Sequence, residues 1–144
     1  MKNWIKSMFV MLCGMMIATT FVACGDDDDD ENGSVTAKSL VGTWKGVMSE
    51  TYNGKTYTWT DCITLNSDKS GKEFVIESNG EVYEVATFTW SLSGNTVTYT
   101  YTWVNDDADE IKVGDTESST IISVNSTTLV INVKGKKLTL TKAQ

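Results

Sequence analysis

Two carboxylates are the residues of this sequence best suited to act together on a substrate. Asp61 lies two positions from Trp59 and two from Ile63, and Glu84 lies four positions before Phe88. Side chains two positions apart in a strand lie on the same face, so both carboxylates could point into an apolar interior. Paired carboxylates carry out glycoside hydrolysis. The alternatives are a structural place at the rim of the fold and hydrogen bonding to a bound ligand.

The composition argues against most enzyme classes. The 144 residues include no histidine and no arginine. A Ser-His-Asp triad and an imidazole metal ligand are therefore excluded, and no glycine-rich phosphate loop is present. Cys62 has no histidine to activate it as a nucleophile, and its alternation places it on the face opposite Trp59. We expect a protein without enzymatic activity, cofactor or bound metal.

One loop loosely matches the spacing of a calcium site, but we expect it to be a hairpin turn. The flanking segments read as strands, whereas the calcium loop of this spacing lies between helices. Residues 105–110 (NDDADE) form a second acidic loop, which we expect to be solvated. The net charge of −7, without arginine, argues against a nucleic-acid partner. The residues at positions 1, 3, 5, 6 and 12 of the calcium spacing are Asn66, Asp68, Ser70, Gly71 and Glu77.

Aromatic side chains give the stronger indication of a binding site. Several fall on single alternating rows, where they could line one interior together with a carboxylate. Ligand pockets are mostly apolar with a few placed polar groups, and buried tyrosine and tryptophan require partners for their polar atoms. The alternative is simple filling of the core. The candidate ligand-binding residues are Trp44, Tyr57, Trp59, Asp61, Trp90, Tyr99, Tyr101 and Trp103.

The body of the chain has the pattern of consecutive antiparallel strands. Residues 96–103 place tyrosine, valine and tryptophan on one face and threonine on the other, which is typical of a sheet with one wet side. Asn53-Gly54 and Asn79-Gly80 are hairpin signals. The alternation slips in the fourth segment, which predicts a bulge near Val85 and Ala86. The eight predicted strands are 41–51, 55–66, 72–78, 81–92, 96–104, 116–124, 127–134 and 136–142.

Eight hairpin-linked strands without helices predict an all-β fold, an eight-stranded antiparallel up-and-down barrel. Such a barrel removes exposed sheet edges by closing on itself, and eight strands enclose either a packed interior or one small ligand. A two-sheet β-sandwich is the alternative. Residues 38–144 are long enough for one core without disulfides.

The N-terminal segment reads as an export signal. Lys2 and Lys6 precede an apolar stretch that ends at Ala23. This stretch is shorter than the roughly 20 residues that span a membrane, and it is typical of a cleaved signal peptide. Five aspartates and a glutamate follow Cys24 and Gly25. A block of like charge stays extended and solvated, so we expect a signal peptide at 1–23 and a disordered acidic tether at 24–37.

The segment Phe21-Val22-Ala23-Cys24 resembles the lipobox of bacterial lipoproteins, with Phe21 where leucine is usual. The resemblance implies acylation of Cys24, for example by palmitate, and two or more acyl chains give stable anchoring. The acidic run that follows resembles the surface-export signal of Bacteroidota lipoproteins. It implies attachment to the outer membrane with the body exposed at the cell surface.

The segment Leu40-Val41-Gly42-Thr43-Trp44 resembles the first strand of lipocalin-like proteins, whose Gly-x-Trp motif is here Gly42 and Trp44. Residues 65–71 and 88–98 also resemble the lipocalin-like lipoproteins of Bacteroidota. Animal lipocalins place an arginine of the last strand over the motif tryptophan. Since arginine is absent here, the feature is either missing or supplied by Lys136 or Lys137.

Together these expectations describe a lipid-anchored envelope lipoprotein whose lipocalin-like barrel binds a small, partly apolar ligand. The alternative is a non-enzymatic interaction module at the outer membrane with a filled barrel, whose partner is an envelope protein or a glycan.

Overall fold

The computed structural model describes residues 35–108 and 111–144. The predicted signal peptide, the lipidation site Cys24 and most of the predicted tether lie outside these residues. In the described part of the chain, no helix has both the length and the apolar character needed to cross a membrane.

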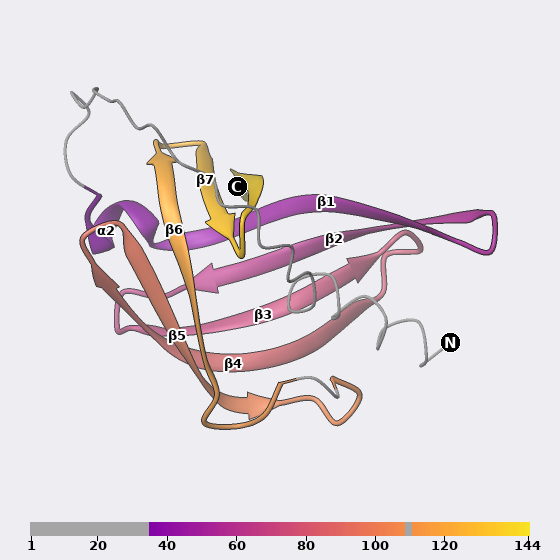
Figure 1. Ribbon diagram of the computed structural model, residues 1–144, viewed down its shortest axis with the longest axis horizontal. Coiled ribbons are helices and arrows are strands. Elements are labelled where there is room, and N and C mark those ends of the chain that lie inside the picture. Colours follow the sequence, from indigo (N-terminus) through magenta and orange to yellow (C-terminus); the bar gives the residue numbers. More distant parts are fainter. Residues whose placement is uncertain (1–34, 109–110) are drawn as a thin grey trace.

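Eight antiparallel strands form a closed barrel, in which each strand pairs with its neighbours in sequence and β1 pairs with β8 (Figure 1). The predicted barrel is confirmed, and the two-sheet sandwich is excluded. Each predicted strand exists, with ends that differ by two residues at most. The strands are β1 (Gly42–Tyr52), β2 (Lys55–Leu65), β3 (Ser70–Glu77), β4 (Val82–Ser93), β5 (Thr96–Val104), β6 (Thr116–Val124), β7 (Thr128–Val133) and β8 (Lys136–Lys142).

A short helix that the sequence analysis did not predict, α2 (Ala37–Leu40), precedes β1 and lies at one end of the barrel (Figure 1). Thr36 caps the helix: its side chain accepts a hydrogen bond from the Ser39 backbone N–H, and the Ser39 side chain accepts one from the Thr36 backbone N–H. Val35 and Ala37, assigned to the tether from the sequence, pack against the core. The ordered body therefore includes residues 35–37.

Bulges decide which side chains face the barrel interior. Between β3 and β4, Glu84 pairs with Phe74 and Ala86 pairs with Glu73, so Val85 is the extra residue. The predicted bulge is confirmed. A second bulge lies in β5, where Thr87 pairs with Trp103 and Phe88 pairs with Tyr101, which leaves Thr102 unpaired. A bulge of this kind reverses the side-chain alternation beyond it.

Large apolar side chains fill the barrel at the end next to α2. Leu40 and Trp44 have no exposed surface, and the Trp44 indole Nε1 donates to the Leu40 carbonyl oxygen at 2.8 Å. Gly71 leaves room for Phe88, since a Cβ there would lie 2.4 Å from its ring. We call this region the capped end. It comprises Leu40, Trp44, Leu65, Gly71, Phe88, Trp90, Val97, Leu129 and Leu140.

Candidate functional site

Strand β3 places one charged residue, Glu73, on the inner face of the barrel and two apolar residues on the outer face. Glu73 pairs with Ile63 of β2 and Ala86 of β4, and it shares its face with the buried Val75. The alternate residues of the strand, Phe74 and Ile76, therefore lie on the outer face of the barrel. This arrangement is the reverse of what hydrophobic burial alone would favour, and it places a carboxyl group inside.

The barrel interior beyond the capped end carries a set of polar side chains, which we call the polar half. Asp61 accepts a hydrogen bond from the Trp59 indole Nε1 at 3.1 Å. Burial raises the pKa of Asp61 to about 6, and this hydrogen bond partly opposes the rise. The polar half comprises Asp61, Glu73, Tyr99, Tyr101, Glu117 and Ser119.

Glu73 is the most perturbed carboxyl of the set. The residue keeps some exposed surface, but its carboxyl group lies deep in the protein. Burial raises the pKa of Glu73 to about 8, and the neighbouring charges of Asp61 and Glu117 raise it further in the same direction. At neutral pH Glu73 is therefore largely protonated.

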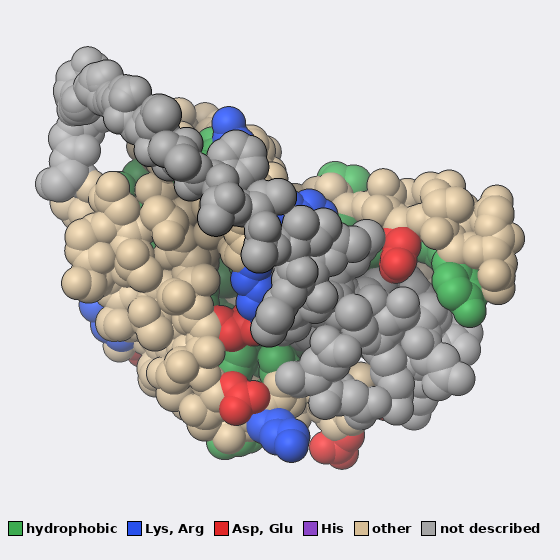
Figure 2. Space-filling model, in the orientation of Figure 1, with side chains coloured by type: hydrophobic (Ala, Val, Ile, Leu, Met, Phe, Trp, Pro, Cys, Tyr) green, Lys and Arg blue, Asp and Glu red, His purple; other side chains and the backbone are tan. Residues whose placement is uncertain are grey.

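Strands β5 and β6 supply the remaining polar contacts. The Tyr101 hydroxyl donates to Glu117 at 3.2 Å, and Lys134 lies 3.6 Å from the same carboxylate. The Ser119 hydroxyl donates to the Tyr99 oxygen at 3.0 Å. Burial raises the pKa of Tyr99 to about 12, so its hydroxyl stays protonated and can also donate. The face shown in Figure 2 has acidic, basic and hydrophobic side chains next to one another beside β6.

The structure brings some of the predicted ligand-binding residues together and separates others. Trp59, Asp61, Tyr99 and Tyr101 all lie on inward rows in or beside the polar half, and half-buried Tyr57 shares the row of Trp59. By contrast, Trp44 and Trp90 belong to the capped end, where they are 0% and 3% exposed. Those two indoles therefore serve the packed core.

Two expectations about placement are wrong. Trp103 faces outward and is 44% exposed, because the bulge at Thr102 reverses the alternation of β5. Glu84 also lies outside the barrel, where its side chain is 60% exposed and 3.8 Å from Lys72. The pair of Asp61 and Glu84 considered for glycoside hydrolysis is therefore not assembled, and Glu73 is the carboxyl that lies near Asp61.

The motif tryptophan is covered by a lysine of the last strand, but not by either predicted one. Lys142 Nζ lies 5.3 Å from the centre of the Trp44 ring. Its stem packs against Gly42, where a Cβ would lie 2.6 Å from the Lys142 Cε. Lys136 and Lys137 begin β8 at the opposite end of the barrel and are exposed. A cation over an aromatic face is attracted by the ring quadrupole, so Lys142 supplies the missing feature.

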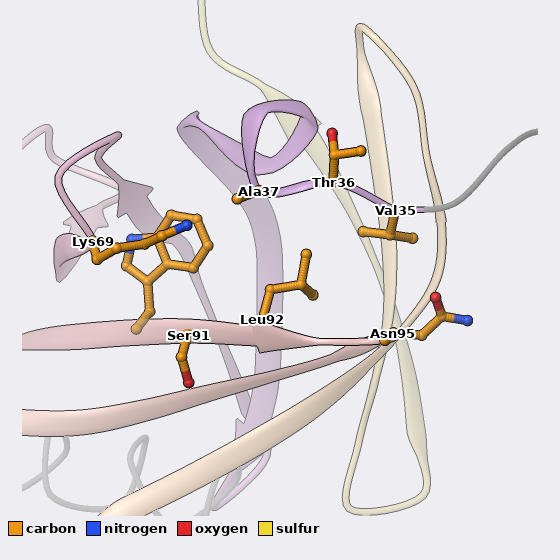
Figure 3. Close-up of a pocket in the computed structure, with 9 residues that line it drawn as sticks. Val35, Thr36, Ala37, Lys69, Ser91, Leu92 and Asn95 are labelled. Carbon is orange, nitrogen blue, oxygen red and sulfur yellow. The ribbon is translucent and has the colours of Figure 1, made fainter.

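A separate pocket of about 540 Å³ opens beside α2, outside the polar half (Figure 3). Lys69 Nζ lies 4.3 Å from the centre of the Trp90 ring, and Val35 and Leu92 complete the apolar lining. Lys69 has a φ of 72°, a left-handed backbone conformation that non-glycine residues seldom adopt. This pocket is open to the surface, and none of its lining residues belongs to the polar half.

The loop with calcium-like spacing is a tight turn between β2 and β3. Asp68 Oδ1 accepts hydrogen bonds from the Ser70 backbone N–H at 2.9 Å and from its hydroxyl at 2.5 Å. These bonds lower the pKa of Asp68. Within residues 35–108 and 111–144, no three histidine, cysteine or acidic side chains are grouped as they would be around a metal ion.

Sequence reasoning missed Glu73 and Glu117. Glu73 follows the turn Ser67–Gly71 and Lys72, so it reads as part of a solvated hairpin. The alternation of β3 offered one signal, because Glu73 and Val75 share a face and Val75 is apolar. For Glu117, the corresponding signal was its place two residues before Ser119 and four before Ile121, on the same face of β6.

Comparison with known proteins identifies the fold. The family model described as "Lipocalin-like domain" matches residues 40–131. A search of the curated proteins finds no match. Among solved structures, a lipocalin-like protein from Bacteroides uniformis ATCC 8492 has 13% sequence identity and a TM-score of 0.55, covering 73% of this chain and 99% of that one. An uncharacterized protein from Bacteroides eggerthii DSM 20697 has 11% identity and a TM-score of 0.53, covering 72% and 99%.

Proposed function

The chain belongs to the lipocalin-like domain family, and from that membership we propose that it binds one small, partly apolar molecule inside its barrel. The proposed activity is binding and not catalysis. The observation that carries this proposal is the polar half, where a deeply placed carboxyl group faces the interior next to aromatic side chains. Binding sites of this kind combine an apolar lining with a few polar groups that fix orientation.

The difference in packing between the two parts of the interior supports this proposal. At the capped end the indoles of Trp44 and Trp90 donate to backbone carbonyl oxygens, so their polar atoms are satisfied by the protein. In the polar half, Glu73 receives no such bond from the described residues, and buried polar groups are normally hydrogen-bonded. A ligand would satisfy what the protein leaves unsatisfied.

Native mass spectrometry of the full chain purified from its own host tests this proposal. We expect an added mass that disappears on denaturation, and solvent extraction of the same sample identifies the class of the ligand. A bare mass, combined with no thermal shift across lipids, sterols and saccharides, would contradict a ligand-carrying barrel.

We further propose that the protein is a lipoprotein of the outer membrane, acylated at Cys24 and exposed at the cell surface. The support is the sequence pattern around Cys24 and the acidic run that follows it. Metabolic labelling with a palmitate analogue should mark the wild-type protein and leave Cys24→Ala unlabelled. Protease treatment of intact cells should remove the barrel. Cleavage only after the envelope is broken would contradict surface exposure.

One observation favours a second function, that of an interaction module. Val47, Ile76 and Val82 lie in one row across the outer face of β1 to β4, and Val47 and Val82 are 74% and 58% exposed. An exposed apolar row is a candidate contact surface for an envelope protein. A photo-crosslinker at Val47 should then give one defined adduct on intact cells, and a crosslinker at exposed Thr139 should not.

A further inference from the structure

Three carboxylates from three strands share the polar half. Asp61 comes from β2, Glu73 from β3 and Glu117 from β6, and the charges of Asp61 and Glu117 both act on Glu73. Carboxylates that lie close together in a partly buried site repel one another in their charged forms. The repulsion is relieved either by protonation of one carboxyl group or by a cation placed among the three.

Two of the three carboxylates have partners within the protein. Asp61 accepts from the Trp59 indole, and Glu117 accepts from Tyr101 and lies 3.6 Å from Lys134. Glu73 differs, because among residues 35–108 and 111–144 it forms no hydrogen bond and no ion pair. A deeply placed carboxyl group without a partner is a second indication, beyond the cluster of charge, that the site is completed by a ligand.

No lysine of the described residues neutralises Glu73. On its own strand, Lys72 points outward and lies 3.8 Å from Glu84. Lys134, in the turn after β7, lies 3.6 Å from Glu117 of β6. The elements paired with β3 present Ile63 and Ala86 beside Glu73, and β5 contributes the Tyr99 hydroxyl.

Aromatic side chains contact two of the carboxylates. The Trp59 indole donates to Asp61, and the Tyr101 hydroxyl donates to Glu117. Aromatic faces attract organic cations, and an ammonium group offers three hydrogen-bond donors and no acceptor. Such a group matches a site made of carboxylate oxygens better than an alcohol or an acid does.

We infer that the ligand of the barrel is an organic cation, a protonated primary amine on an apolar body, whose ammonium group is held by Glu73 together with Asp61 and Glu117. This inference rests on the proposed small-molecule function and names its ligand class. The amine displaces the proton that Glu73 carries in the empty barrel, so binding releases a proton to the solvent.

Because binding releases a proton, the affinity for the amine should depend on pH. Glu73 titrates near pH 8 in the empty barrel, and a primary amine has a pKa of about 10. Between pH 6 and 8 the amine is charged while Glu73 carries a proton that binding removes. The affinity therefore rises with pH in this window, by up to about tenfold for each pH unit.

Isothermal titration calorimetry of the full chain with 2-phenylethylamine, 2-phenylethanol and 3-phenylpropionate tests the inference. These probes share an aromatic body and carry a positive, a neutral and a negative end. We expect the amine to bind at least about tenfold more tightly than the alcohol, and the carboxylate to bind more weakly than either. Titrations in phosphate and in Tris should differ in apparent heat by the ionisation of one released proton.

Two variants distinguish the effect of a carboxyl group in the site from that of a carboxylate on the surface. Glu73→Gln should reduce the preference for amine over alcohol at least about tenfold and abolish proton release, while Glu84→Gln, which alters an exposed carboxylate, should retain both. If Glu73→Gln does not fold, Glu117→Gln should still reduce the preference for amine over alcohol, because it removes one of the three carboxylates. Equal binding of amine and alcohol would overturn the inference and leave small-molecule binding intact. No probe binding, with no added mass on the native protein, would overturn both.

Discussion

The capped end and the polar half occupy the same barrel but follow opposite rules. At the capped end, Trp44 is fully buried and its indole N–H is satisfied by the Leu40 carbonyl oxygen. In the polar half, Glu73 lies deep in the interior without a partner in the described part of the chain. The first region gains stability from close packing. The second costs stability, which is typical of a site that serves binding.

The largest expected effect comes from breaking the capped end. Trp44→Ala should lower the free energy of unfolding by about 3–5 kcal/mol, because it leaves a cavity at a fully buried position. Trp103→Ala, the matched control at a 44% exposed tryptophan, should cost much less. Urea denaturation of both variants measures the difference. Equal losses would mean that the two tryptophans are equally important to the core.

Replacing the Glu73 carboxyl group in the polar half should instead raise the stability of the protein at high pH. The folded-state pKa of Glu73 is raised to about 8, so the folded protein holds a proton that the unfolded chain has lost above about pH 4.5. Stability therefore falls as pH rises between about 5 and 8, by up to about 1.4 kcal/mol for each pH unit. Glu73→Gln should flatten this slope and raise stability at pH 8.

Thermal unfolding of wild type and Glu73→Gln at pH 5, 6.5 and 8 measures the slope. Asp61, with its pKa raised to about 6, contributes a separate fall between about pH 4 and 6 that remains in the variant. A wild-type protein as stable at pH 8 as at pH 5 would contradict the burial of Glu73.

Alanine substitutions at two glycines test how tightly their surroundings are packed. In Gly71→Ala the new Cβ meets the Phe88 ring and the Thr64 carbonyl oxygen, neither of which can move easily, and we expect a loss of about 1–3 kcal/mol. In Gly46→Ala, beside Asp61, the new Cβ meets the flexible end of Leu140 and the loss should be smaller. Chemical denaturation compares the two. A larger loss at Gly46 would show that Leu140 adjusts less easily than the surroundings of Gly71.

The smallest effect on stability is expected where the first strand, β1, meets the last strand, β8. Lys142→Met removes the cation over the Trp44 ring but keeps the apolar stem, and we expect a loss of about 0.5–1 kcal/mol. Lys136→Met, on an exposed residue of the same strand, is the control. Thermal shifts that match between the two variants would show that the cation contributes nothing.

The sequence predicted the strands and their order well, because alternation and turn residues act locally. It also located the bulge at Val85, since a change of alternation is visible in the apolar pattern itself. The bulge at Thr102 escaped, because tyrosine, threonine and tryptophan continue the pattern unbroken through it. The resulting outward turn of Trp103 depends on pairing with β4, which no local pattern encodes.

The candidate site was predicted only in part. Asp61, Tyr99 and Tyr101 were identified because they lie among aromatic residues, whereas Glu73 sits in a charged segment that resembles a surface turn. Its inward placement is set by register with Ile63 and Ala86, which are contributed by other strands. Similarly, the lysine over Trp44 depends on the crossing of β1 and β8, which places Lys142 there and keeps Lys136 far away.

The contact between β1 and β8 is short, with only Trp44–Lys142 and Lys45–Thr141 paired in the ladder. Its partners are nearly a hundred positions apart along the chain, so the loop that closes it is the longest of any strand pair. Loop closure over such a separation carries a large entropic cost and slows folding. The seam is therefore expected to form last, and the folding chain remains an open, curved sheet with exposed edges until it does.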